Sequence, residues 1–422
     1  MRVGEVRHPE RGTSGKPLEG VRILAAEQMQ ALPYATQLLA HLGAEVVKIE
    51  TPGRGDTGRF SNPALEDERG RAVGATFLRN NLSKKSVEID LKSDAGRELF
   101  RRLVPRFDVV AENFRAGSME ALGLGYEALS RLHPSLVYVS LSGFGNLERS
   151  PYASWPAYAP VAEAMGGLYE PNRKEGQPPP VVVAGALGDN AAALFSVIGT
   201  LSALRHRDRT GEGQHVDVAM YDSMIAMTDM VPFLWSMGAP AKMAAAGTTA
   251  LVAAFAATNG HFVVAVFREH MFEKFCKTIG HPEWLGDPRF AERTGWAAHT
   301  ESVIRPAVEA WARDKTKLEA CQLLCEQGIV AGPSNTAEDI HADPHVVARD
   351  MLIEVPRPDA ERPYLVVGNP VKMSRLAEGP VGTFPRLGEH TEEVLRRELS
   401  MSDDELNELR TAGAIPPLQE AR

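Results

Sequence analysis

A single carboxylate stands out in the stretch 181–205, VVVAGALGDNAAALFSVIGTLSALR. The stretch begins as an apolar run, passes two glycines and continues with apolar residues at helical spacing, which places Asp189 where a loop turns into a helix. Two interpretations of its side chain are open. Aspartate is a favoured N-cap residue, so Asp189 could cap this helix. A carboxylate held between glycines near helix N–H groups is also ionised and open to close approach, which suits a nucleophile.

Small and polar residues also follow three strands expected in the first third of the chain. They are Met29, Gln30 and Ala31 after the first of these strands, Asn113 and Phe114 after the second, and Ser142 and Gly143 after the third. Ligands usually lie at the carboxyl ends of strands in an open α/β sheet. None of these loops has the glycine pattern of a dinucleotide or nucleoside triphosphate site, so the sequence does not indicate either kind of ligand.

Strands and helices alternate in the part of the chain that carries these residues. The expected strands are 21–25, 45–50, 86–91, 108–112, 136–141 and 214–219, and the expected helices are 34–42, 94–104, 126–132 and 221–237. A strand, a helix and a strand in close succession form a βαβ unit, which implies parallel strands with right-handed crossovers. We predict an α/β fold with an open, parallel, Rossmann-like sheet.

The composition changes at 238–247, where alanine and glycine predict a linker. A strand at 261–267, helices beginning near 272, 302 and 318, and a connection at 328–332 then predict a smaller α/β domain. Two amphipathic helices, 391–399 and 403–412, end the chain. We divide the chain into a large domain (1–237), a small domain with its linkers (238–332) and a C-terminal segment that returns to the large domain (333–422).

Bulk properties narrow the classes of function. The chain has 422 residues, 44% of them hydrophobic and 24% charged, with a net charge of -9, which is the profile of a soluble globular protein. Without a basic surplus, nucleic acid is not an expected partner. The polar N-terminus and the absence of an apolar run of about 20 residues predict neither a signal peptide nor a membrane anchor. Cys321 and Cys325 lack further metal ligands nearby, so we expect reduced thiols in a cytoplasmic protein without a metal site.

The chain resembles the class III CoA-transferases, also called the CaiB/BaiF family. The segments that carry the resemblance occur in the order found in the family and span about 17–399; they include LGAEVVKIE at 42–50, SLSGFG at 140–145, GALGDNAAAL at 185–194, TGEGQHVDVAMYDS at 210–223 and LGEHTEEVL at 387–395. The family contains formyl-CoA:oxalate and carnitine CoA-transferases together with 2-methylacyl-CoA racemases. The resemblance implies an enzyme that moves CoA from an acyl-CoA thioester to a carboxylic acid acceptor, with CoA as part of the substrate and no metal.

Asp189 matches the nucleophile of this family. The resemblance implies that its carboxylate attacks the thioester carbonyl, giving a mixed aspartyl anhydride and the CoA thiolate, and that the acceptor then receives CoA by way of an aspartyl-CoA thioester. A thiolate is a good leaving group because the pKa of a thiol is low, near 8.5. We expect the backbone N–H groups of Gly188 and Asn190 to support the developing oxyanion.

The resemblance also implies which residues contact CoA. They are Met29, Gln30 and Ala31 near the pantetheine and the thioester, Ile89, Asp90, Leu91, Lys92, Asn113, Phe114 and Arg115 at the adenosine end, and Ser142 and Gly143 in a third loop. Phe114 could instead be a core aromatic residue and Asn113 a turn residue.

Some positions depart from the formyl-CoA enzyme. Thr51 and Ala121 stand where that enzyme has arginines that face the CoA phosphates, so we expect Arg115 and Lys92 to contact the phosphates instead. Ser142 replaces a lysine, and no run of consecutive glycines occurs near residue 247. Formyl-CoA:oxalate transfer itself is therefore not expected, and dicarboxylate, aromatic and carnitine-like acids all stay open as acceptors.

The sequence argues against two other functions. A 2-methylacyl-CoA racemase needs a base and an acid on opposite faces of its substrate, but Tyr158 and Ala159 stand where the racemases have a His-Asp dyad. A non-catalytic acyl-CoA-binding protein would be expected to lack the nucleophile, whereas Asp189 is present. The resemblance further implies a homodimer whose two chains are interlocked like linked rings.

Overall fold

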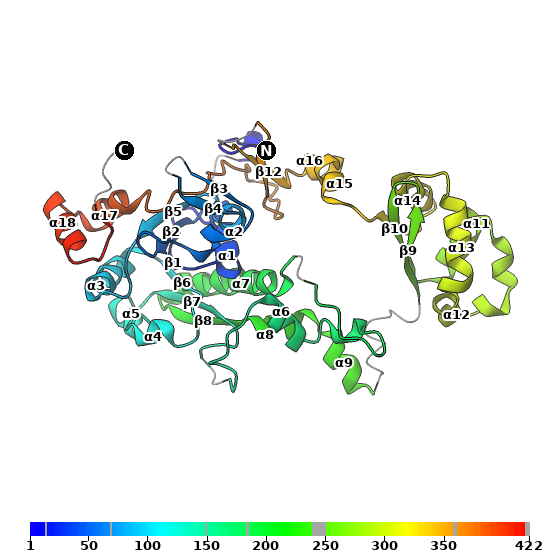
Figure 1. Ribbon diagram of the computed structural model, residues 1–422, viewed down its shortest axis with the longest axis horizontal. Coiled ribbons are helices and arrows are strands. Elements are labelled where there is room, and N and C mark those ends of the chain that lie inside the picture. The colour runs from blue at the N-terminus through cyan, green and yellow to red at the C-terminus, as the bar shows by residue number, and fades with distance from the viewer. Residues whose placement is uncertain are drawn as a thin grey trace. The chain divides into compact units, whose positions relative to one another are not determined.

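The computed structural model of the chain describes residues 1–12, 15–67, 70–147, 150–182, 185–238, 250–357 and 361–417 (Figure 1). These residues form two compact units. The larger comprises Met1–Glu170, Pro178–Asp229 and Val347–Arg422, and the smaller comprises Pro171–Gln177 and Met230–Val346. Apart from Gly238, the linker predicted at 238–247 lies outside the described residues. The division into 1–237, 238–332 and 333–422 stays a prediction.

A six-stranded parallel sheet forms the centre of the larger unit. Its strands are β1 (Arg22–Ala26), β2 (Glu45–Glu50), β5 (Lys84–Glu88), β6 (Val109–Glu112), β7 (Val137–Ser142) and β8 (Gln214–Ala219). They lie in the order β5-β2-β1-β6-β7-β8, and every neighbouring pair is parallel. This is the doubly wound order, whose direction of winding reverses between β1 and β6. The predicted open parallel sheet is confirmed.

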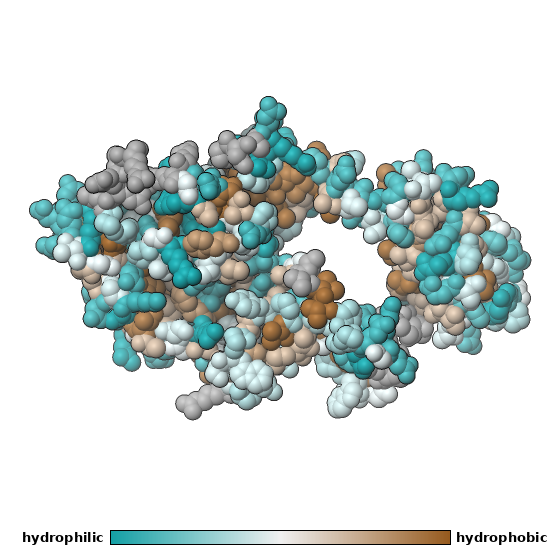
Figure 2. All heavy atoms as spheres, in the orientation of Figure 1, coloured by the Kyte–Doolittle hydropathy of each residue, from teal (hydrophilic) through white to brown (hydrophobic). Residues whose placement is uncertain are grey.

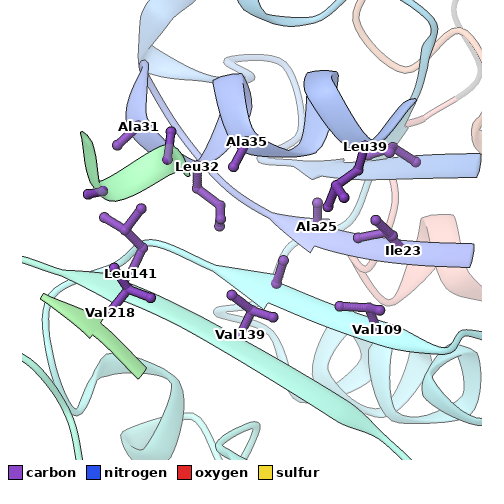
Figure 3. Close-up of a cluster of buried hydrophobic side chains, with 14 of the residues drawn as sticks. Ile23, Ala25, Ala31, Leu32, Ala35, Leu39, Val109, Val139, Leu141 and Val218 are labelled. Atoms are coloured by element: carbon purple, nitrogen blue, oxygen red, sulfur yellow. The ribbon is translucent and has the colours of Figure 1, made fainter. Parts of the chain in front are cut away.

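Two helices cover one face of this sheet, namely α1 (Ala31–His41) and α7 (Leu187–Thr210). Leu32, Ala35 and Leu39 recur along α1 at helical spacing and point toward strand residues such as Ile23 and Val139 (Figure 3). The predicted helix 34–42 thus begins three residues earlier than expected, at Ala31. Its first turn lies directly after the loop that follows β1.

The other face is covered by four helices from two distant parts of the chain. The helices are α3 (Asp94–Leu103), α5 (Tyr126–Leu132), α17 (Thr391–Leu399) and α18 (Asp403–Thr411). Phe100 of α3 belongs to the same buried cluster as Val394 of α17 and Leu406 of α18. The two predicted C-terminal amphipathic helices therefore exist, and they bury their apolar faces on the large sheet.

Helix α7 lies against the sheet at very short range. A Cβ added to Gly199 would come within 2.5 Å of Val216 on β8, so only glycine allows this approach. Within the described part of the chain, α7 is the helix long and apolar enough to cross a membrane by length and composition. It packs against α1, α8 (Met220–Met227) and β8, and 44% of its apolar window is buried.

Two predicted elements differ from the structure. The predicted helix 221–237 is two helices, α8 and α9 (Met230–Ser236). Thr228 separates them, because its hydroxyl donates to the carbonyls of Met224 and Gly166 and α8 ends there. The predicted strand 86–91 is shifted to Lys84–Glu88, since the chain leaves the sheet where the Asp90 backbone N–H donates to the carbonyl of Ala414.

The smaller unit contains an antiparallel sheet in the order β11-β10-β9. Its strands are β9 (Leu251–Ala257), β10 (Gly260–Val266) and β11 (Val330–Pro333), and its main helices are α11 (Glu269–Thr278), α12 (Arg293–Ala298), α13 (Arg305–Ala312) and α14 (Lys317–Glu326). A core rich in aromatic residues joins them, in which the rings of Phe272 and Trp296 stack with their centroids 4.2 Å apart. The predicted smaller α/β unit is therefore present, but β9 was missed and 328–332 contains part of β11 rather than only a connection.

Short elements complete the described chain. They are α2 (Ala75–Asn80), α4 (Ser118–Ala121), α6 (Ala159–Met165), α15 (Ala337–Ala342) and α16 (Pro344–Ala348), and the antiparallel pairs β3 (Ala64–Glu66) with β4 (Ala72–Gly74) and β12 (Leu352–Val355) with β13 (Tyr364–Val367).

Candidate active site

The loops after β1 and β6 are tied together where the winding of the sheet reverses. The side-chain oxygen of Asn113 accepts from the Gln28 backbone N–H at 2.8 Å, and its amide donates to the Gln28 carbonyl at 2.9 Å. Both ends of the Asn113 amide are thus engaged with the backbone of one residue, Gln28. Asn113 holds the two loops at a fixed separation, in the crevice where ligands of doubly wound sheets bind.

A cavity of about 410 Å³, which we call the Asp189 cavity, lies at this edge of the sheet. Nine residues singled out in the sequence line it: Met29, Gln30, Ala31, Asn113, Phe114, Arg115, Ser142, Gly143 and Asp189. A further wall comes from the segment 155–158, which includes the position of the racemase histidine, and its Trp155 and Tyr158 are largely exposed. The aromatic rings of Phe144, Tyr152 and Trp155 contact one another behind this wall.

A second cavity of about 410 Å³, the Lys92 cavity, lies over the ends of β2 and β5. Its lining includes the predicted residues Ile89, Asp90, Leu91 and Lys92, together with Phe114, Thr51 and Ala121. Gln28 and Phe114 line both cavities, so the two adjoin. The sequence-selected residues therefore line two neighbouring cavities.

The loop between β1 and α1 is held in an unusual conformation. Met29 has a φ of 63°, which is rare for a residue with a side chain. Its backbone N–H donates to Asp56 Oδ1 at 2.9 Å, and the other oxygen of Asp56 forms an ion pair with Lys48 at 2.8 Å. The side chains of Asp56 and Lys48 are fully buried. A buried ion pair therefore fixes the backbone that leads into the cavity, as expected where strain is retained near a functional site.

More buried charges extend this support, and we call Glu27, Lys48, Asp56 and Lys84 the buried charge cluster. Lys84 Nζ lies 2.7 Å from Glu27 Oε1, and Lys48 Nζ lies 3.5 Å from the same oxygen. Burial alone would raise the pKa of Glu27, but the two lysines together lower it, so this carboxylate is ionised. Against the effect of its burial, the carboxylates raise the pKa of Lys48, whereas burial lowers the pKa of Lys84 to about 8.

Asp189 is the third residue of α7, not its cap. The capping position belongs to Ala186, whose φ of 40° is left-handed and whose side chain makes no capping bond. The capping interpretation of Asp189 is therefore wrong. Among the residues that the structure describes, none donates a hydrogen bond to the Asp189 carboxylate. The preceding Gly188 is required by packing, because an added Cβ would lie 3.0 Å from the backbone of Ala159 on α6.

The surroundings of Asp189 raise its pKa to about 6. Burial is the main cause, the negative charge of Glu163 adds to it, and the positive charge of Arg79 opposes both. The carboxylate is therefore mostly ionised at neutral pH but more basic than an ordinary aspartate. Since none of the described residues donates a hydrogen bond to it, its oxygen lone pairs are available for attack on a substrate.

The expected oxyanion donors are not free. The Gly188 N–H donates to Glu163 Oε1 at 2.9 Å, and the Asn190 N–H donates to the carbonyl of Ala186 at 3.0 Å. The expectation that these two groups support the oxyanion is therefore wrong, because the first turn of α7 uses them. The backbone N–H of Ala31, at the start of α1, has no acceptor among the described residues, and Ala31 lines the cavity.

Sequence reasoning missed Glu163 and Arg79. Glu163 is the single carboxylate of the otherwise apolar helix α6, a signal that was available but not used. Arg79 lies on α2 and donates to the side-chain oxygen of Gln30, whose amide donates to Asn190 Oδ1 at 3.2 Å. No spacing in the sequence marks Arg79, since only the fold brings α2 beside the loop after β1.

Comparison with known proteins identifies the family. The model of CoA-transferase family III matches residues 18–391. The chain belongs to CoA-transferase family III. The match includes the residues that line both cavities, with Asp189 among them. The prediction of a class III CoA-transferase, and hence of an enzyme, is confirmed.

Several relatives of this family III enzyme carry named activities. A succinyl-CoA:mesaconate CoA-transferase of Haloarcula hispanica is 37% identical over 90% of this chain and 95% of its own. A succinyl-CoA–D-citramalate CoA-transferase of Chloroflexus aurantiacus is 34% identical over 95% and 98%. A formyl-CoA:oxalate CoA-transferase of Rhodopseudomonas palustris is 30% identical over 96% and 99%. These names favour transfer of CoA over racemisation.

Solved structures agree with the sequence relatives. A CaiB/BaiF family protein from Brucella suis superposes with a TM-score of 0.79 at 31% identity, covering 91% of this chain and all of the other. The structure of Rv3272 from Mycobacterium tuberculosis gives a TM-score of 0.76 at 30% identity, over 90% and 99% of the two chains. The family III fold therefore extends over almost the whole chain.

Proposed function

We propose that this family III enzyme transfers CoA from an acyl-CoA to a carboxylic acid with Asp189 as the covalent nucleophile. The observation that carries the proposal is the Asp189 carboxylate, which faces a cavity, accepts no hydrogen bond from the described residues and has a pKa raised to about 6. Such a carboxylate combines an ionised state at neutral pH with unusual basicity. Both properties favour attack on a thioester carbonyl.

The first half of the reaction forms an aspartyl-CoA thioester. An oxygen of Asp189 attacks the acyl carbonyl, the C–S bond breaks, and CoA leaves as a thiolate while a mixed anhydride forms. The thiolate then attacks the Asp189 carbonyl, and the donor acid leaves as its carboxylate. No proton, oxidant or reductant is consumed in either step. The Ala31 N–H and the start of α1 are our candidates for stabilising the oxyanions of these steps.

The second half reverses this sequence with the acceptor. The acceptor carboxylate attacks the aspartyl-CoA carbonyl and releases the CoA thiolate, which then attacks the acceptor carbonyl of the new anhydride. The acceptor leaves as its CoA thioester and Asp189 is regenerated as a carboxylate. Because both halves use the same anhydride chemistry, the enzyme needs one nucleophile and a CoA that stays bound between the halves.

We assign the two adjoining cavities to the two ends of CoA. The Asp189 cavity holds the thioester and the acyl group, with Met29, Gln30 and Ala31 along the pantetheine. The Lys92 cavity holds the adenosine end, over Ile89, Asp90 and Leu91, while Phe114 packs where the two cavities meet. Lys92 lines the second cavity and Arg115 the first, so the two proposed phosphate contacts divide between them. Thr51 and Ala121 leave the floor of the Lys92 cavity uncharged at their positions.

The proposed donor is succinyl-CoA, with a short dicarboxylic acid as the acceptor. This choice follows the names of the relatives that share the highest identities quoted above. The residue identities at 51, 121 and 142 that argue against formyl-CoA:oxalate transfer support the same choice.

The proposal is tested by intact-protein mass spectrometry after incubation with succinyl-CoA and trapping with hydroxylamine or borohydride. We expect the adduct at Asp189 in the wild type, its absence in Asp189→Asn, and its full yield in Asp94→Asn, a fully exposed control. Failure to trap Asp189 with any acyl-CoA, together with exchange of the substrate's α proton in deuterated water, would instead indicate a racemase.

We also propose that the enzyme is an interlocked homodimer that acts in the cytoplasm. Exposed apolar side chains support assembly, namely Leu194 and Ile198 on α7 and Phe233 and Trp235 on α9, with 47%, 58%, 61% and 78% of their surface exposed. Figure 2 shows apolar side chains gathered on the surface where the chain enters α7. A molar mass of one chain in solution would contradict the dimer. The free thiols of Cys276, Cys321 and Cys325 fit a reducing compartment.

A further inference from the structure

Asp189 is flanked by two charges of opposite sign that do not touch it. Glu163 reaches it from α6, and its Oε1 accepts from the N–H of Gly188, the residue immediately before Asp189, at 2.9 Å. Arg79 reaches it from α2 through the Gln30 side chain, which is hydrogen-bonded to Asn190, the residue immediately after Asp189. Glu163 is therefore hydrogen-bonded to the residue before the nucleophile, and Arg79 is linked through Gln30 to the residue after it.

The Glu163 contact is buried and fixed from both sides. Glu163 is 1% exposed, and its second oxygen accepts a hydrogen bond from the hydroxyl of Tyr169, which is 4% exposed. The close approach of α6 and α7 at Gly188 leaves no room for another side chain between them. Glu163 thus caps the start of α7 in place of a residue of that helix, and it places a carboxyl group beside the turn that carries Asp189.

The Arg79 contact is arranged differently. Arg79 itself is exposed, but the Gln30 amide that it holds lies in the wall of the Asp189 cavity. Asn190 continues the chain of hydrogen bonds by donating to the Gly185 carbonyl at 2.7 Å. The series Arg79–Gln30–Asn190–Gly185 therefore joins α2, the loop after β1 and the start of α7, and it holds the Arg79 guanidinium where its charge acts on Asp189 through space.

We propose that Glu163 and Arg79 are positioning residues that set the basicity of the Asp189 nucleophile by opposing electrostatic effects. The inference rests on the proposed function, because it assumes that Asp189 reacts. A negative neighbour favours the protonated, more basic carboxyl group, and a positive neighbour favours the ionised one. The other charged or titratable groups around Asp189 are Arg115 and Tyr158 in the cavity wall and Tyr169 behind Glu163. Neither Glu163 nor Arg79 touches the reacting atoms.

The test is the pH dependence of the rate at which Asp189 is acylated by succinyl-CoA, measured by rapid mixing and intact mass. Glu163→Gln keeps the shape and loses the charge, so the pH at which the rate falls on the acid side should drop by about one unit. Arg79→Gln should move the same limb upward by a similar amount, and the double variant should return close to the wild-type limb. A purely structural role for either residue would lower the rate without moving the limb.

Three controls make the result decisive. Glu127→Gln removes an exposed charge from α5 and should leave the limb in place. Arg79→Lys keeps the positive charge and should restore most of the shift. Because Arg79 is exposed, its variants remain informative if Glu163→Gln does not fold. Limbs that stay fixed in both variants, or that move in the same direction, overturn the inference. Absence of acylation in the wild type at every pH overturns the proposed function instead.

Discussion

Asp56 and Asp189 both lie next to the loop 27–31, but Asp56 is buried and hydrogen-bonded whereas Asp189 faces a cavity. Asp56 is fully buried, holds the Met29 and Gly58 backbone N–H groups with one oxygen at 2.9 and 2.7 Å, and pairs with Lys48 through the other oxygen. Asp189 opens onto a cavity that this loop also lines, and accepts no hydrogen bond from the described residues. A carboxylate with satisfied oxygens fixes the backbone, whereas a carboxylate without partners can form a bond with a substrate.

The comparison also separates the two kinds of electrostatic environment. In the buried charge cluster the opposite charges lie in direct contact, so each lowers the cost of burying the other. Around Asp189 the nearby charges of Glu163 and Arg79 act without contact, and burial leaves the pKa of the carboxyl group raised. We expect substitutions in the cluster to affect mainly stability and substitutions at Asp189 to affect mainly activity.

The largest effect on stability is expected for Lys48→Met. The substitution keeps an elongated side chain but leaves Glu27 and Asp56 with one fewer cation in a fully buried place. Breaking a buried ion pair in this way costs about 3–5 kcal/mol of unfolding free energy. Chemical denaturation monitored by circular dichroism measures it.

Lys85→Met is the matched control for this prediction. Lys85 neighbours Lys84 on β5, but its side chain is 25% exposed and pairs with Glu393 at the surface. Its loss should cost no more than about 1 kcal/mol. Equal losses for Lys48→Met and Lys85→Met would contradict the distinction between the buried cluster and the surface. The Lys48 variant should also react more slowly below its unfolding transition, because Asp56, which accepts the Met29 N–H, loses the cation that fixes its other oxygen.

A smaller effect, of opposite sign, is expected for Asp189→Asn. The pKa of Asp189 rises from 3.8 to about 6 on folding, so the native state binds a proton that the unfolded state has lost between these two values. The ionised carboxylate therefore costs stability above about pH 6 and nothing below about pH 4. Asp189→Asn removes this cost and should raise the unfolding free energy at pH 8 by at most about 3 kcal/mol.

Thermal unfolding at a series of pH values checks this prediction. The difference in unfolding free energy between Asp189→Asn and the wild type should grow as the pH rises from about 4 to about 7 and then stay constant. Asp56→Asn is the matched comparison, because it removes the partner of Lys48 and should destabilise the protein at pH 8. If Asp189→Asn is instead less stable than the wild type at pH 8, the prediction is wrong and the carboxylate has a structural role.

Much of the larger unit was predictable because local patterns and global fold agree. The strands of the sheet are short apolar runs ended by polar loops, and helices between them force parallel pairing. The order of the strands then places the ends of β1 and β6 together, so Gln28 and Asn113 meet. The strand β9 was missed because alanines separate its buried residues, Leu251 and Phe255, and hide the alternation.

The parts of the site that were not predicted depend on contacts between distant segments. The resemblance identified Asp189, but the sequence did not show that Ala186 adopts the left-handed conformation and moves Asp189 into the first turn. That shift also engages the N–H groups of Gly188 and Asn190. Arg79 and Glu163 come from helices more than 80 residues apart in the chain, and no periodicity connects them.

The smallest effect is expected at the exposed end of the CoA site. Lys92 is exposed at the rim of the Lys92 cavity, so a phosphate contact there is screened by water and contributes about 1 kcal/mol. Lys92→Ala should raise the KM for succinyl-CoA several-fold with kcat unchanged, because the contact is equally strong in the ground and transition states. Arg115→Ala should lower kcat as well, since Arg115 lines the same cavity as Asp189. Steady-state kinetics with succinyl-CoA and succinyl-dephospho-CoA separate the two: if Lys92 binds the 3′-phosphate, its substitution has no effect on the dephospho donor. A KM unchanged by Lys92→Ala with both donors would remove Lys92 from the CoA site and leave Arg115 as the remaining candidate of the pair.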